Sequence, residues 1–128
     1  MGREKIKIRA TKKTPGVELD DGKIVFDGRS IPEDPNKFYK PIYEWIKQYS
    51  NEEITPTRID LKFEYINTSS TKWVYAVLKE IGMNQNLADK VEIKWYFEEG
   101  DDDMQELGYI LKSMVLCPFV LIETEEKK

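Results

Sequence analysis

Apolar and polar residues alternate in several short segments of the chain, and apolar residues recur every three or four positions in three longer ones. Alternation is typical of a strand with one buried face, and the longer spacing is typical of an amphipathic helix. The alternation predicts strands near residues 6–10, 17–19, 24–26, 59–65 and 91–97, and a short apolar run predicts a last strand at 119–122. The helical spacing predicts helices near residues 35–49, 74–81 and 104–115.

The same pattern predicts the layers of the fold. The two best strands are polar at every second position, whereas a strand covered by helices on both faces would be apolar throughout. One face of the sheet is therefore expected to meet water, and all three helices to pack on the other. We predict a two-layer α/β domain over residues 1–128, with a mixed sheet of about five or six strands. An antiparallel hairpin turns at Asp21-Gly22, right-handed crossovers follow, and residues 123–128 form a frayed tail.

Composition narrows the range of functions. The 128 residues carry 20 Lys and Arg against 24 Asp and Glu, a formal charge of −4, which argues against a nucleic-acid-binding domain. The chain has no histidine, which removes the commonest general base and every imidazole metal ligand, and its single cysteine excludes an internal disulfide. No apolar run is long enough to span a bilayer, and the N-terminus does not resemble a secretory signal. We expect a cytoplasmic protein that binds neither membrane nor nucleic acid.

The most informative segment is the predicted turn from a strand into a helix at Asn67-Thr68-Ser69-Ser70-Thr71-Lys72. Short polar side chains at such a turn commonly cap the helix by accepting hydrogen bonds from its first N–H groups. One cap needs only one residue, however, and here four hydroxyls follow one asparagine. The second interpretation is phosphorylation, because the positive end of a helix tolerates a phosphate, which would add nearly two negative charges to a docking surface.

Two other features of the sequence are candidates for a functional site. An acidic run at residues 98–103, with Glu106 nearby, lacks the spacing of a calcium-binding loop, and acids at a helix start complement its dipole. We therefore expect no metal ion and no cofactor. The alternation sends Tyr96 to the polar face of its strand, where it could anchor an interface.

Motifs along nearly the whole chain, residues 6–122, resemble the SiaC-type regulatory phosphoproteins of bacteria. The motifs that carry the resemblance are Thr14-Pro15, Gly28-Arg29-Ser30, Pro32-Glu33, Phe38-Tyr39, Trp45, Asn67-Thr68-Ser69-Ser70, Trp95-Tyr96-Phe97 and Asp102-Asp103-Met104. The Asn-Thr-Ser-Ser segment is the most specific of them. The resemblance implies a fold similar to that of the anti-sigma-factor antagonists (STAS domains).

The resemblance also implies a function in partner switching. Family members are phosphorylated by a cognate kinase on a threonine of this segment and dephosphorylated by a PP2C-type phosphatase. The unmodified form stimulates a diguanylate cyclase, which raises cyclic di-GMP and favours aggregation or biofilm. The matching threonine is Thr68, and Ser69, Ser70 and Thr71 are secondary candidates. We expect partner contacts at Asn67, Thr68, Ser69, Ser70, Lys72 and Tyr96.

Three alternatives stay open at this point. A similar switch domain could control a different output, as anti-anti-sigma proteins do. A small histidine-free enzyme could use the hydroxyl cluster or the acidic run, although the chain offers little for catalysis. A scaffold subunit could use the hydroxyls only as caps. The oligomeric state does not follow from the sequence.

Overall fold

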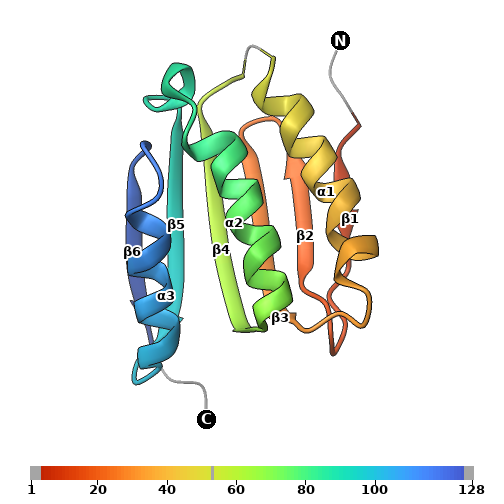
Figure 1. Cartoon of the computed structure of the whole chain (residues 1–128), viewed down its shortest axis with the longest axis vertical. Coiled ribbons are helices and arrows are strands. Elements are labelled where there is room, and N and C mark those ends of the chain that lie inside the picture. Colours follow the sequence, from red (N-terminus) through yellow and green to blue (C-terminus); the bar gives the residue numbers. More distant parts are fainter. Residues whose placement is uncertain (1–3, 53, 126–128) are drawn as a thin grey trace.

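A computed structural model describes residues 4–52 and 54–125. The elements in chain order are β1 (Ile6–Ile8), β2 (Gly16–Asp20), β3 (Lys23–Ser30), α1 (Pro35–Ser50), β4 (Thr57–Ile66), α2 (Thr68–Gly82), a short 3-10 turn (Gln85–Leu87), β5 (Val91–Glu98), α3 (Asp102–Lys112) and β6 (Phe119–Thr124). The strands form one sheet in the order β1-β2-β3-β4-β5-β6, so that every strand pairs with its neighbour in sequence (Figure 1).

The sheet is mixed. β1, β2 and β3 pair antiparallel, and Asp21-Gly22 forms the tight turn between β2 and β3, with Gly22 at a positive φ of 78°. The pairs β3–β4, β4–β5 and β5–β6 are parallel, and each is connected through a helix. The parallel strands follow one another across the sheet in one direction, and connections between parallel strands are right-handed. The three connecting helices therefore lie on the same face of the sheet.

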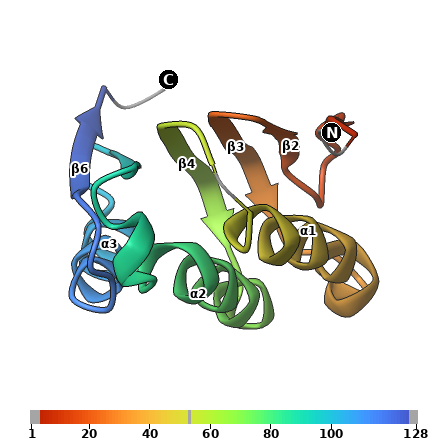
Figure 2. The same cartoon turned by 90° about the horizontal axis from the view of Figure 1, so that it is seen from above.

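All three helices cover one face of the sheet and leave the other open (Figure 2), which confirms the predicted two-layer architecture. On β4, Ile59, Leu61 and Phe63 are buried beneath the helices, while Arg58 and Lys62 are exposed on the far face. The predicted frayed tail at residues 123–128 is partly wrong, because Glu123 and Thr124 belong to β6 and pair with Phe97 and Glu98 of β5; residues 126–128 lie outside the described part of the chain.

The α3 helix ends earlier than the pattern predicted. Its last residue is Lys112, although the spacing predicted a helix to residue 115, and Met114 is 38% exposed. Gly108 allows α3 to lie very close to β5, because a Cβ atom at this position would be only 2.5 Å from Cδ1 of the fully buried Trp95. None of the helices in residues 4–52 and 54–125 has the length and apolar character that a bilayer crossing requires.

Candidate functional site

The turn from β4 into α2 is built around Asn67. This residue has an extended backbone (φ −87°, ψ 172°), its side-chain Oδ1 accepts a hydrogen bond from the Ser70 N–H at 2.9 Å, and its carbonyl accepts one from the Thr71 N–H at 2.9 Å. Asn67 is therefore the N-cap, and Thr68 is the first residue of the helix. The cap uses only the asparagine side chain, so the four hydroxyls that follow are not needed for it.

One of these hydroxyls is part of the core. Ser70 is fully buried; its Oγ accepts a hydrogen bond from Oγ of Ser30 at 2.8 Å and donates to the Ser30 carbonyl at 3.2 Å. The Ser30 hydroxyl thus uses its proton on Ser70, so the Tyr39 hydroxyl, 2.5 Å away, donates to Ser30. Burial raises the pKa of the Tyr39 phenol, which keeps it protonated and able to donate.

This buried chain of hydroxyls fixes the turn to the rest of the fold. Ser30 is the last residue of β3 and Tyr39 lies on α1, while the Asn67 N–H donates to the Ser30 carbonyl at 3.0 Å. Ser70 was predicted as a secondary phosphorylation site and a partner contact, and this prediction is corrected here. Its hydroxyl is buried and hydrogen-bonded to Ser30, so neither a kinase nor a partner can reach it in the folded chain. No pattern in the sequence indicates that Ser30 and Ser70 meet, since 40 positions separate them.

The remaining hydroxyls differ in accessibility. Thr68 and Ser69 are exposed at the beginning of α2, and Lys72 is exposed one turn further along. Thr71 is half-buried, and its hydroxyl donates to the Asn67 carbonyl at 2.9 Å. The N–H groups of the first helical turn have no partners within the helix and give this end a partial positive charge. A phosphate on Thr68 would therefore lie where the helix stabilises an anion, by about 0.3–1 kcal/mol.

Tyr96 lies on the face of the sheet opposite to the helices. Its neighbours on β5, Trp95 and Phe97, are buried beneath the helices, so its side chain projects from the open face, where the Lys62 ammonium lies 5.0 Å from the ring centroid. Tyr96 lines a hollow of about 310 Å³ there, together with Lys62 and Glu98. Thr68, in contrast, is the first residue of α2, in the helical layer. Tyr96 and the hydroxyl cluster therefore lie on different faces of the sheet, and the partner contact at Tyr96 stays a prediction.

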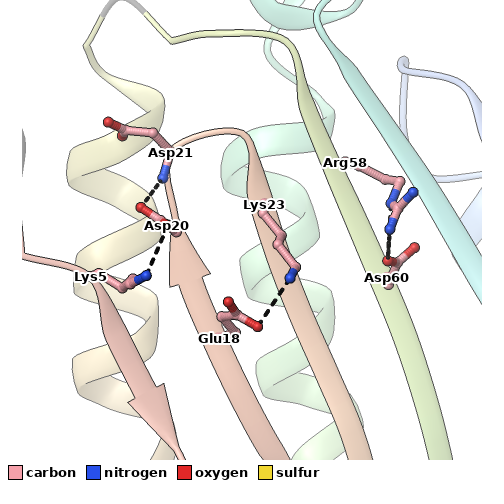
Figure 3. Close-up of polar contacts among 7 residues, drawn as sticks. All are labelled: Lys5, Glu18, Asp20, Asp21, Lys23, Arg58 and Asp60. Atoms are coloured by element: carbon pink, nitrogen blue, oxygen red, sulfur yellow. Dashed lines mark hydrogen bonds and ion pairs between the residues drawn. The ribbon is translucent and has the colours of Figure 1, made fainter.

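Charged side chains of several strands lie on the open face (Figure 3). Ion pairs join Lys5 to Asp20 at 3.7 Å and Lys23 to Glu18 at 3.4 Å across strands. Asp60, at 3% exposure, is the exception to the exposed polar pattern of β4: its Oδ2 pairs with the Arg58 guanidinium at 3.0 Å, and its Oδ1 has no hydrogen-bond partner among the described residues. Most charges on this face thus meet water or one another.

The acidic run begins the third helix. Asp101 is the N-cap of α3, and its Oδ1 accepts a hydrogen bond from the Met104 N–H at 3.1 Å, while Asp102 and Asp103 occupy the first turn. This confirms that the acidic run lies at the start of a helix, where it complements the dipole, and Asp101 also caps the helix. In the part of the chain that the structure describes, no three His, Cys, Asp or Glu side chains come together in a way that could hold a metal ion.

Apolar side chains next to Thr68 were not included in the sequence-based site. Thr68, Lys72 and Tyr75 on α2 line a groove whose opposite wall includes Ile110 on α3 and Met114 just after it. The exposed fractions of the Tyr75, Ile110 and Met114 side chains are 37%, 45% and 38%. An available signal was that Tyr75 and Ile110 lie outside the core stripes of their helices.

Comparison with known proteins identifies the class first. A family model described as "SiaC family regulatory phosphoprotein" matches residues 8–124, nearly the entire chain, which places the protein among regulatory phosphoproteins. Within that class, the chain belongs to the SiaC family. This confirms the resemblance seen in the sequence motifs.

Individual relatives are distant in sequence but close in fold. The uncharacterized protein PA14_02130 of Pseudomonas aeruginosa (strain UCBPP-PA14) is 23% identical over 121 residues, which cover 93% of this chain and 96% of that protein. SiaC of Pseudomonas aeruginosa, solved in complex with the diguanylate cyclase SiaD that it activates, superposes with a TM-score of 0.85 at 22% identity, covering 93% of this chain and 99% of the other. A further structure of SiaC of Pseudomonas aeruginosa superposes with a TM-score of 0.81 at 21% identity, covering 97% of this chain and 100% of the other. These structural likenesses show that the fold is shared.

Proposed function

We propose that this protein binds and stimulates a diguanylate cyclase when Thr68 is unmodified, and that phosphorylation of Thr68 blocks the binding. Membership of the SiaC regulatory phosphoprotein family and the activation of a diguanylate cyclase by SiaC of Pseudomonas aeruginosa support this function. The protein acts in the cytoplasm, where GTP, the substrate of such a cyclase, is available. A cognate kinase and a PP2C-type phosphatase set the level of phosphorylation.

The observation that carries the proposal is the contrast between neighbouring hydroxyls. Thr68 is exposed at the first position of α2, whereas Ser70 is buried and Thr71 is half-buried and hydrogen-bonded. A kinase can therefore reach Thr68 without unfolding the helix. Ser69 is also exposed and serves as the natural comparison position.

Phosphorylation at Thr68 would leave the fold intact and change the surface. The phosphate stands at the positive end of α2 and carries about −1.5 to −2 charges. A partner that covers Thr68 would bury this dianion, and without a matching cation that costs several kcal/mol. We expect binding to weaken by about 100-fold or more, which corresponds to about 2.8 kcal/mol.

The test measures cyclase binding by calorimetry and cyclic di-GMP formation with the unmodified chain, with phosphothreonine incorporated at position 68, and with phosphoserine incorporated at position 69 as the position control. Unmodified protein and Thr68→Ala should bind and stimulate the cyclase, phosphothreonine at 68 should abolish both, and Thr68→Glu should give a partial loss because it carries less charge. Equal affinity of the phosphorylated and unmodified chains would contradict the switch. Phosphate-sensitive binding to another protein, with no effect on any cyclase, would instead indicate a different output.

A further inference from the structure

The groove beside Thr68 arises from the way the sheet opens. β4 and β5 pair only from Thr57–Val91 to Leu61–Trp95, although β4 continues to Ile66 and β5 to Glu98. Beyond the last pair the two strands diverge, and α2 and α3, which follow them, lie apart as well (Figure 1). α1 packs closely on α2, whereas α2 and α3 make few backbone contacts. The space between α2 and α3 is a groove of about 330 Å³.

The walls of the groove are arranged for an incoming helix. Side chains from successive turns of α2 and α3 line its two sides, so that a third helix can insert its own side chains between theirs. The apolar surface needed for this is already exposed at Tyr75, Ile110 and Met114. A partner strand would instead need free backbone groups at a sheet edge, and the backbone groups of two helices are bonded internally.

The charge in the groove specifies which helix fits. Among the described residues that line it, Lys72 is the single charged side chain, and no carboxylate accompanies it, although the whole chain carries a net charge of −4. Thr68, Lys72 and Tyr75 lie on successive turns of one face of α2, with the positive end of the helix beside Thr68. A carboxylate on the partner is therefore complementary to this end of the groove.

We propose that the partner docks an acidic amphipathic helix in the groove between α2 and α3, with its apolar face on Tyr75, Ile110 and Met114 and a carboxylate on Lys72. Thr68 phosphorylation, which is part of the proposed function, then acts by competition. A phosphate on Thr68 lies four residues before Lys72, the spacing at which side chains of a helix meet. It pairs with the Lys72 ammonium, removes the cation that the partner needs, and repels the partner's carboxylate.

The docking test uses calorimetry with the cyclase that binds the unmodified chain, and compares substitutions on the same helix. Ile110→Asp should weaken binding by about 30-fold or more, as expected for losing a central apolar anchor. Tyr109→Asp is the matched control, because Tyr109 is 56% exposed on the same helix but does not line the groove. The affinity of this variant for the cyclase should stay within about twofold of that of the natural chain. Equal affinities for both variants and the unmodified chain would overturn the docking surface.

The charge test pairs Lys72→Glu with Lys40→Glu, which makes the same charge change on an exposed position of α1. We expect about 10- to 100-fold weaker binding for Lys72→Glu alone, and recovery when the contacting carboxylate of the partner is replaced by lysine. Phosphorylation of Thr68 lowers the affinity by a certain factor in the natural chain. In a Lys72→Ala background this factor should be about tenfold smaller. An undiminished effect of phosphorylation in that background would overturn the competition.

The outcomes separate this inference from the proposed function. If phosphothreonine at position 68 abolishes binding while Ile110→Asp and Lys72→Glu bind normally, the switch stands and the groove is wrong. If the groove variants lose binding and phosphorylation has no effect, the docking surface stands and the switch is wrong. Absence of binding to any diguanylate cyclase overturns both. Self-association of the chain that Ile110→Asp abolishes would show that a second copy occupies the groove, which also overturns the proposal.

Discussion

Replacing Ser70 with alanine tests whether the hydroxyls of the turn have separate functions. Ser70 Oγ accepts a hydrogen bond from the Ser30 hydroxyl at 2.8 Å and donates one to the Ser30 carbonyl at 3.2 Å, in a fully buried site. Ser70→Ala removes both bonds and leaves the Ser30 groups without these partners. Because unpaired buried polar groups are costly, the expected loss of stability is about 1–3 kcal/mol.

The measurement is urea and thermal unfolding of Ser70→Ala beside Ser69→Ala. Both substitutions gain the better helix propensity of alanine. Because Ser69 is exposed, the difference in stability between the two variants isolates the loss of the buried hydrogen bonds of Ser70. For a chain of 128 residues, the typical unfolding entropy gives about 4 °C per kcal/mol, so Ser70→Ala should lower the melting temperature by about 4–11 °C. Ser69→Ala should change the stability by less than about 0.5 kcal/mol.

The reasoning is refuted if Ser70→Ala is as stable as the natural chain, or if Ser69→Ala is destabilised equally. Folded Ser70→Ala should still bind the partner and respond to phosphorylation at Thr68, because Thr68 lies outside the buried network. Stoichiometric phosphorylation of Ser70 in the folded natural chain would likewise contradict the burial of its hydroxyl.

Three further predictions concern stability. Gly108→Ala should destabilise the protein by about 1–3 kcal/mol in urea titrations despite the better helix propensity of alanine, because the new Cβ would lie 2.5 Å from Cδ1 of Trp95; a neutral effect would show that α3 can move away from β5. Asn67→Ala should cost about 0.5–2 kcal/mol by removing the cap of α2, while Asn67→Asp should retain most of the stability. The raised pKa of the buried Tyr39 phenol means that the unfolded chain loses this proton at lower pH than the folded chain does. Stability from this group is therefore present below the ordinary tyrosine pKa of about 10 and falls as the pH rises above it, and Tyr39→Phe should show a smaller alkaline loss; identical alkaline profiles would contradict this.

Local pattern was sufficient for the elements and layers of this protein. Alternation along residues 59–65 and 91–97 depends only on the two-residue period of a strand, so it predicted a sheet with one covered face and helices on the other. Capping by Asn67 and by Asp101 is equally local, because each side chain bonds an N–H three residues ahead. The motif around Thr68 is contiguous in sequence, which is why the family could be identified before the fold was known.

The tertiary structure alone decided which hydroxyl is accessible and what lies beside it. Ser69 and Ser70 are adjacent in sequence and identical in type, and they differ because the helix directs one toward water and the other toward Ser30 at the end of β3. Tyr96 lies on the open face of the sheet, whereas Thr68 begins a helix on the covered face. The groove beside Thr68 exists because β4 and β5 stop pairing after Leu61 and Trp95. Strand register and crossover geometry join residues far apart in the chain, and no short-range periodicity encodes those distances.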